Sequence, residues 1–185
     1  MTLTVLSPPL TPALSLQTAK AHLRIGHDAE DALVAELLQA ATDRLETATG
    51  LALVERTLQR ELRAWPATLA GRGYVLRPRP VSRVEAVSLV DADGTETALG
   101  DRFDLVDGRL VLKPWAHLPP LAAGSRLRVR FVAGSAAEEV PGDLLLALKL
   151  LLAQAYRRGR DVVTAAEDLP TEVAAILAAR REVRL

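Results

Sequence analysis

SLQTAKAHLRIGHDAEDALVAELLQAATDRLETATG, residues 15–50, predicts a short helix, a polar break and a long amphipathic helix. Ser15 suits the N-cap of the first helix, because its hydroxyl can accept a hydrogen bond from a free N–H of the first turn. Gly26-His27-Asp28 is expected to break the helix, and Asp28 to cap the second one. Gly50 ends the second helix, where a left-handed residue is favoured.

The second helix carries apolar residues at steps of three and four, which form one buried stripe along it. The members of this stripe are Val34, Leu37, Leu38, Ala41, Leu45 and Ala48.

Downstream of Gly50 the pattern becomes strand-like. Asp91–Gly94 supplies turn chemistry between two strands, and Asp107-Gly108 is a strong signal for a two-residue hairpin. Strands are expected at 53–62, 74–76, 84–89, 95–99, 103–106, 109–112 and 126–132. Together they predict a small antiparallel β-sheet.

The most hydrophobic helix is expected to begin at Pro141. Its main face contains Leu144, Leu145, Leu148, Leu151, Leu152 and Ala155. Leu146 and Leu150 widen this face, which predicts burial on two sides. Asp161–Asp168 is expected to be a linker, and Pro170 to start a short helix with Val173, Ile176 and Leu177 on one face.

The order of helices, strands and helices predicts an α+β fold with N-terminal helices, a small antiparallel sheet, a long buried C-terminal helix and a short terminal helix. Residues 1–14 are expected to form an extended arm, since Pro8, Pro9 and Pro12 disfavour a helix. Whether the arm drapes over a neighbour or is disordered stays open. Residues 15–160 are expected to form the main domain, and residues 161–185 a linker, helix and tail.

Composition narrows the class of protein. The 185 residues are 49 % hydrophobic and 3 % aromatic, which predicts an aliphatic core, and the formal net charge of zero argues against a general polyanion binder. There is no cysteine, which excludes disulfides. The start MTLTVLSPPLTPALS lacks the basic region of a signal peptide, and the longest apolar run, Leu144–Ala153, is too short to span a bilayer.

No motif for catalysis, cofactor binding or metal binding is found. The histidines, His22, His27 and His117, lack the spacing of metal ligands. Asp91–Gly94 is similar to the start of a calcium loop, but the glutamate that such a loop needs downstream is misplaced. P-loop, dinucleotide-binding and GxSxG motifs are also missing. The sequence therefore predicts a protein that is not an enzyme and uses no cofactor.

Two groups of arginines stand out. Arg77, Arg79 and Arg83 surround a turn, whereas Arg126, Arg128 and Arg130 lie along one strand face. Solvated strand edges explain them, and so do salt bridges between subunits of a ring. For the second interpretation, the long helix offers the acidic residues Glu30, Asp31, Glu36, Asp43 and Glu46.

Several short segments, in their order and spacing, give the chain a resemblance to a known family. They are Ala19–Ile25, Asp28–Leu33, Glu46–Gly50, Leu76–Val81, Val129–Gly134, Val140–Leu144, Leu169-Pro170 and Arg180–Leu185. With these segments, most of residues 15–185 resembles the head–tail connector (adaptor) proteins of long-tailed bacteriophages and gene transfer agents.

The resemblance implies a structural subunit in the neck of a virion or virus-like particle, made in the cytoplasm of the bacterial host. It implies a ring of about a dozen copies beneath the portal protein, with a stopper or tail-terminator protein on the other side. Double-stranded DNA would pass through the ring without sequence-specific binding, and no membrane is involved. A tail-completion or stopper protein is an alternative, and a small enzyme or a DNA-binding regulator is another.

Two sets of site residues follow from this reading. The set expected to bind the portal is Ile176, Leu177, Arg180, Arg181, Val183, Arg184 and Leu185. The set expected at the ring interface is Glu30, Asp31, Glu36, Asp43, Arg77, Arg79 and Arg128.

Overall fold

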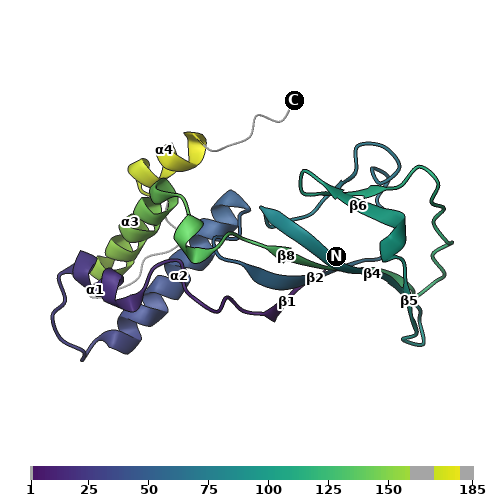
Figure 1. The fold of residues 1–185 in the computed structure, drawn as a ribbon. Coiled ribbons are helices and arrows are strands. Elements are labelled where there is room, and N and C mark those ends of the chain that lie inside the picture. Colours follow the sequence, from purple (N-terminus) through teal and green to yellow (C-terminus); the bar gives the residue numbers. More distant parts are fainter. Residues whose placement is uncertain (1, 159–168, 180–185) are drawn as a thin grey trace. The chain divides into compact units, whose positions relative to one another are not determined.

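The computed structural model describes residues 2–158 and 169–179. The chain divides into two compact units, each made from two separate stretches of sequence. Met1–Leu10 and Val54–Ser135 form what we call the β unit, and Thr11–Leu53 and Ala136–Leu185 form the helical unit. The α+β class predicted from the sequence is confirmed, with four helices and two antiparallel sheets in the described residues (Figure 1).

The helical unit contains all four helices. They are α1 (Leu16–Leu23), α2 (Asp31–Thr49), α3 (Gly142–Arg158) and α4 (Thr171–Ala179). α2 packs against α3, α1 contacts both, and α4 packs against α3. Their fully buried side chains are aliphatic, as expected: Ala19, Val34, Leu38, Ala41, Leu45, Leu144, Ala147, Leu148, Leu151, Leu152 and Val173.

The helix ends partly follow the sequence prediction. Ser15 caps α1 by accepting a hydrogen bond from the Thr18 N–H at 3.2 Å, and Gly50 ends α2 with a φ of 69°. α1 ends at Leu23, with Arg24 in the left-handed region, and residues 26–28 lie in the break between the two helices, as expected. The predicted cap at Asp28 is wrong, because α2 begins after Glu30 without a side-chain cap. The Asp28 carboxylate instead accepts a hydrogen bond from a lysine of α1.

The buried helix faces are narrower than the periodicity predicts. Ala48 of α2 is exposed, and so is half of Leu146 of α3. α3 is therefore buried along a single broad face, because Leu144, Leu148 and Leu151 recur at steps of three and four and Leu146 lies outside that face. The linker predicted at 161–168 lies outside the described residues.

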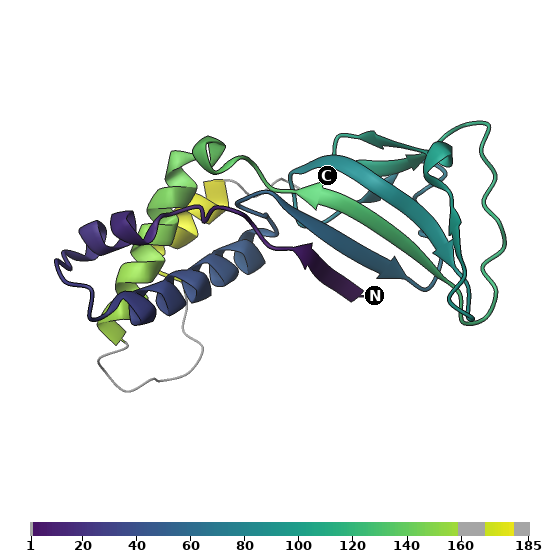
Figure 2. The same cartoon turned by 60° about the horizontal axis from the view of Figure 1, so that its bottom comes forward.

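The β unit has two sheets where the sequence predicts one. The larger has the order β1-β2-β8-β4-β5, with β1 (Thr2–Ser7), β2 (Arg56–Leu62), β4 (Val81–Val90), β5 (Glu96–Ala98) and β8 (Arg126–Ala133). The smaller has the order β3-β7-β6, with β3 (Tyr74–Val75), β6 (Phe103–Val106) and β7 (Arg109–Leu112). Neighbouring strands are antiparallel, and Figure 2 shows β2, β8 and β4 side by side.

The hairpin predicted at Asp107-Gly108 is confirmed. Both residues have positive φ, at 49° and 71°, and Val106 pairs with Arg109 across the turn. The N-terminal arm forms β1, which pairs with β2 of its own chain. An edge strand needs hydrogen bonds on one side only, so the alternating Thr2–Ser7 segment can extend the sheet although it buries little surface.

One face of the larger sheet is the core of the β unit. Leu127, Val129 and Phe131 of β8 are fully buried on this face. Arg60 lies on the same face of β2 and donates a hydrogen bond from Nη2 to the backbone oxygen of Arg77, two residues after the end of β3. The core therefore lies between the two sheets. In the described part of the chain, no helix has both the length and the apolar character that crossing a bilayer requires.

Candidate interaction surfaces

The second face of the larger sheet is polar. β8 alternates, so that Arg126, Arg128 and Arg130 stand opposite to the buried Leu127 and Phe131. This places the three arginines in a row on one strand face, as the sequence predicts.

Arg128 is at the centre of an ion-paired network on this face. Its Nη2 lies 3.0 Å from Oε1 of Glu61 in β2, and its Nη1 lies 2.8 Å from Oε2 of Glu96 in β5. Glu61 also pairs with Nε of Arg126 at 3.2 Å, and Glu96 with Nη2 of Arg130 at 3.8 Å. Strand register explains the network, since Arg128 is directly opposite Glu61.

Glu96 has a further partner besides the arginines of the network. Ser88 donates a hydrogen bond to its Oε1 at 2.5 Å. This bond, together with the positive charges of Arg128 and Arg130, lowers the pKa of Glu96 below its ordinary value against the opposing effect of burial. Glu96 is therefore ionised at neutral pH, and Arg128 forms its ion pairs with carboxylates of its own chain.

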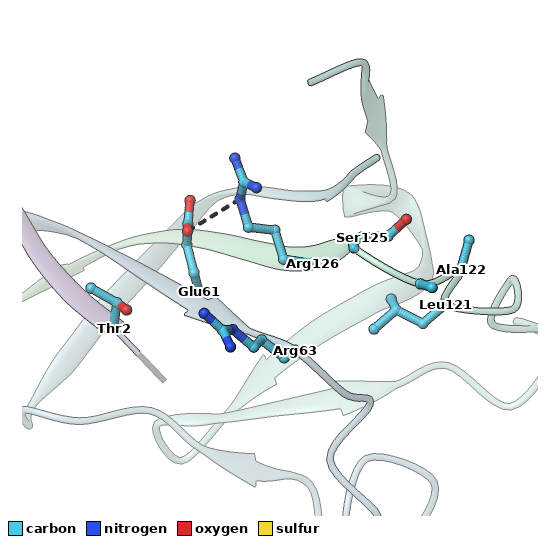
Figure 3. A pocket seen from close by; sticks show the side chains of 9 residues that line it. Thr2, Glu61, Arg63, Leu121, Ala122, Ser125 and Arg126 are labelled. Carbon is cyan, nitrogen blue, oxygen red and sulfur yellow. Dashed lines mark ion pairs between the residues drawn. The ribbon is translucent and has the colours of Figure 1, made fainter. Parts of the chain in front are cut away.

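A cavity of about 540 Å³ opens beside Glu61 and Arg126 of the same network. Figure 3 shows the side chains that line it. Thr2, Glu61 and Arg63 line it on one side, and the loop 121–125 with Arg126 at the start of β8 lines it on the other. Within the described residues the Arg63 guanidinium has no ion-pair partner. The cavity contains no pair of titratable side chains suited to acid–base chemistry, and no three metal-ligating side chains gather anywhere in the described part of the chain.

In the helical unit, ion pairs connect α1 to the start of α2. Nζ of Lys20 lies 2.5 Å from a carboxylate oxygen of Asp28 and 2.5 Å from one of Asp31. The hydrogen bond between Lys20 and Asp28 raises the pKa of the lysine and lowers the pKa of Asp28. Asp31, one of the predicted interface residues, thus contacts a cation of its own chain.

The other acidic members of the predicted ring interface differ in their surroundings. Glu30 accepts a hydrogen bond from the hydroxyl of Tyr156 in α3. Glu36 is exposed on α2, and Asp43, also exposed, accepts a hydrogen bond from the side chain of Gln39 at 2.9 Å. Glu36 and Asp43 are therefore the acidic members most open to a partner.

The basic members all belong to the β unit. Arg77 is exposed and Arg79 is half-buried, on either side of Pro78, whereas Arg128 is in the network described above. The neighbouring Arg83 pairs with Glu55 at 3.3 Å. The predicted ring-interface set is thus divided between the two units and does not form one cluster within either.

The residues predicted to bind the portal begin on α4. Val173 of this helix is fully buried, and Ile176 and Leu177 are half-buried. The remaining members, Arg180, Arg181, Val183, Arg184 and Leu185, lie outside the described residues.

Comparison with known proteins assigns the family. Residues 13–79 match the model of the phage gp6-like head–tail connector proteins. A chain from a structure described as the virion of a native gene transfer agent particle is 32 % identical, with a TM-score of 0.82, and the match covers 100 % of this chain and 97 % of that one. The chain belongs to the phage gp6-like head–tail connector family. The resemblance found in the sequence is confirmed.

Two related structures extend the comparison. A chain in the neck of an empty gene transfer agent particle, computed with C6 symmetry, has a TM-score of 0.82. A chain in the neck of a native particle, computed with C12 symmetry, has a TM-score of 0.77. Both are 32 % identical to this connector over its whole length. No curated protein sequence matches it. The family is structural, which confirms the prediction that this connector is not an enzyme.

Sequence reasoning missed the acidic half of the β-unit network. It offered the acidic residues of the long helix as partners for the arginines, whereas the arginines pair with Glu61 and Glu96 on other strands of the same sheet. A signal was present in the sequence, because Gln59 and Glu61 are two residues apart, as are the arginines of β8. When β2 and β8 pair, Gln59 is opposite Arg130 and Glu61 is opposite Arg128.

Proposed function

We propose that this connector is a subunit of the neck of a gene transfer agent or tailed-phage particle, where it joins the portal to the tail. The observation that carries the proposal is the full-length similarity to neck chains of gene transfer agent particles at 32 % identity. The neutral net charge is compatible with a channel wall that lets DNA pass without retaining it.

In this proposal the subunit forms a ring around the DNA channel. A closed ring needs two different patches on each copy, which meet head to tail. C12 and C6 symmetry in the necks that contain the related chains supports such an arrangement. Glu36 and Asp43 on one copy and Arg77 on the next are the members of the predicted set best placed for it, because all three are exposed.

The end of the chain is proposed to bind the portal. α4 places Ile176 and Leu177 half-buried beside Val173, directly before the basic segment 180–185. Aliphatic side chains followed by arginines suit a partner surface with an apolar groove and an acidic rim. The opposite side of the ring would receive the stopper or tail terminator.

Deletion of the gene in the producing host, followed by electron microscopy, tests the assignment. DNA-filled heads beside unattached tails are expected, because a missing connector interrupts the joint between them. Normal complete particles would contradict the neck assignment. Crosslinking of the protein to portal subunits, and not only to tail subunits, separates an adaptor from a stopper.

The ring is proposed to assemble on the portal, so that the isolated protein is largely monomeric. Light scattering of the purified protein over a dilution series measures its mass. Closed rings that persist at low micromolar concentration without the portal would overturn this part of the proposal. Such rings would leave the neck assignment itself intact.

A further inference from the structure

The N-terminal strand β1 is attached to the β unit along one edge only. It is the outermost strand of the larger sheet and pairs with β2. All six of its residues are exposed, and Leu3, Val5 and Leu6 keep 42 %, 50 % and 47 % of their surface in solvent. β1 therefore adds backbone hydrogen bonds to β2 but contributes little to the core of its own unit.

A proline-rich tether connects β1 to the helical unit. Residues 8–14 contain Pro8, Pro9 and Pro12, and Leu10 is fully exposed. No backbone hydrogen bond joins this tether to other residues that the structure describes. Leu14 at its far end is buried in the helical unit and so fixes the point from which the arm starts. Prolines favour an extended chain of about 3.1 Å per residue, so seven residues span roughly 20 Å.

The same strand pairing can form within one copy or between two. In the register seen here, Thr4 pairs with Gln59 and Val5 with Leu58. These contacts are identical if β1 comes from a neighbouring copy, so exchange replaces each lost contact by an equal one. In an assembled ring the neighbour is held nearby, which gives its arm a high effective concentration at β2.

We propose that, in the assembled ring, β1 of each copy leaves its own β2 and pairs with β2 of the adjacent copy. The partner is a second copy of this chain, and the docking site is the edge of β2 from Arg56 to Leu62. Every copy then gives an arm on one side and receives one on the other, which is the head-to-tail pattern of a closed ring. This inference rests on the proposed function, because it needs neighbouring copies.

Cysteine crosslinking in purified particles tests the exchange, and the chain has no cysteine of its own to interfere. One copy carries Thr4→Cys with a first epitope tag, and a second copy carries Gln59→Cys with a different tag. Both are expressed in the deletion host. Particles are treated with a short bismaleimide and run on denaturing gels. A dimer that contains both tags is expected, and the double variant Thr4→Cys/Gln59→Cys is expected to give a ladder of multimers.

The matched control joins two strands that stay in one chain. Gln59→Cys with Arg130→Cys, register partners in β2 and β8, should give an internal crosslink and no ladder. If the double variant with Thr4→Cys also gives only an internal crosslink, or none while the control reacts, the exchange is overturned and the neck assignment stands. If the protein is absent from particles, both the neck assignment and the exchange fail.

Discussion

The β unit and the helical unit use their charged residues in different ways. In the β unit, Arg126, Arg128 and Arg130 form ion pairs with carboxylates on other strands of the same sheet. In the helical unit, Glu36 and Asp43 remain exposed on α2. Charge in a sequence is therefore not the same as charge available to a partner. Strand register assigns partners to side chains on a sheet face, whereas the outer face of a helix has only its own neighbours at three and four positions.

Gly134 lies against the backbone of Val54 within the β unit, and a change there should have the largest effect. Its φ is +112°, and a Cβ would lie 2.3 Å from the backbone of Val54. In Gly134→Ala, the positive φ strains the backbone of the alanine, which costs about 1–3 kcal/mol of stability. The new Cβ also clashes with the backbone of Val54, and no side-chain rotation can relieve that clash. We expect a loss of folded protein, measured by yield and by urea unfolding. Gly71→Ala is the control, because nothing lies within 4 Å of the added Cβ.

The cores of the two units can be weakened separately. Phe131 of β8 and Leu148 of α3 are both fully buried. Phe131→Ala should cost about 3–5 kcal/mol and Leu148→Ala about 2–5 kcal/mol of unfolding free energy. Amide hydrogen exchange should rise mainly at 54–135 for the first variant and mainly at 16–49 and 142–158 for the second. An equal rise throughout for both variants would show that the units unfold as one.

The elements predicted best are those whose signals are local. The cap at Ser15, the end of α2 at Gly50 and the hairpin at Asp107-Gly108 each depend on residues within one or two turns of the chain. The failed cap at Asp28 shows the limit of this reasoning. The lysine that binds its carboxylate comes from the preceding helix, and nothing in the local spacing distinguishes a capping aspartate from a paired one.

The candidate surfaces were harder to predict than the elements. The row of arginines on β8 could be seen in the sequence, but Glu96 is 32 residues from Arg128 and meets it only because β4 lies between β8 and β5 in the sheet. Similarly, an edge strand at residues 2–7 cannot be recognised without knowing that one edge of β2 is open to pair with it. Both features depend on strand order, which short-range patterns do not encode.

Removal of the central arginine tests whether the β-unit network stabilises the fold. Arg128→Met keeps the aliphatic part of the side chain but leaves Glu61 and Glu96 with fewer partners. Because the network is partly exposed, we expect a loss of about 1–2 kcal/mol in urea unfolding. Arg63→Met, which removes an arginine outside the network, should change stability by less than about 0.5 kcal/mol. Equal effects of the two substitutions would contradict a stabilising role.

Acid should weaken the same network. The pKa of Glu96 is lowered from its ordinary value of 4.5, so its contribution to stability is complete above that value and is lost as the pH falls through the folded-state pKa. Glu96→Gln should therefore lower Tm at pH 7, and the difference from the natural protein should shrink toward pH 3. A difference that stays constant over this range would mean that ionised Glu96 does not stabilise the sheet.

The smallest effect is expected in the helical unit, from the pair that links α1 to α2. The Asp28 side chain is 91 % exposed, so water and salt weaken its attraction to Lys20. The pKa of Asp28 is lowered by that hydrogen bond, so any stabilisation is present above the ordinary value of 3.8 and is lost in acid. Asp28→Asn should lower Tm less than Glu96→Gln does, and 0.5 M NaCl should remove most of the difference. A larger, salt-resistant effect would contradict a weak ion pair that solvent screens. Such an effect would also mean that the solvent exposure of a carboxylate does not decide how much its ion pair stabilises either unit.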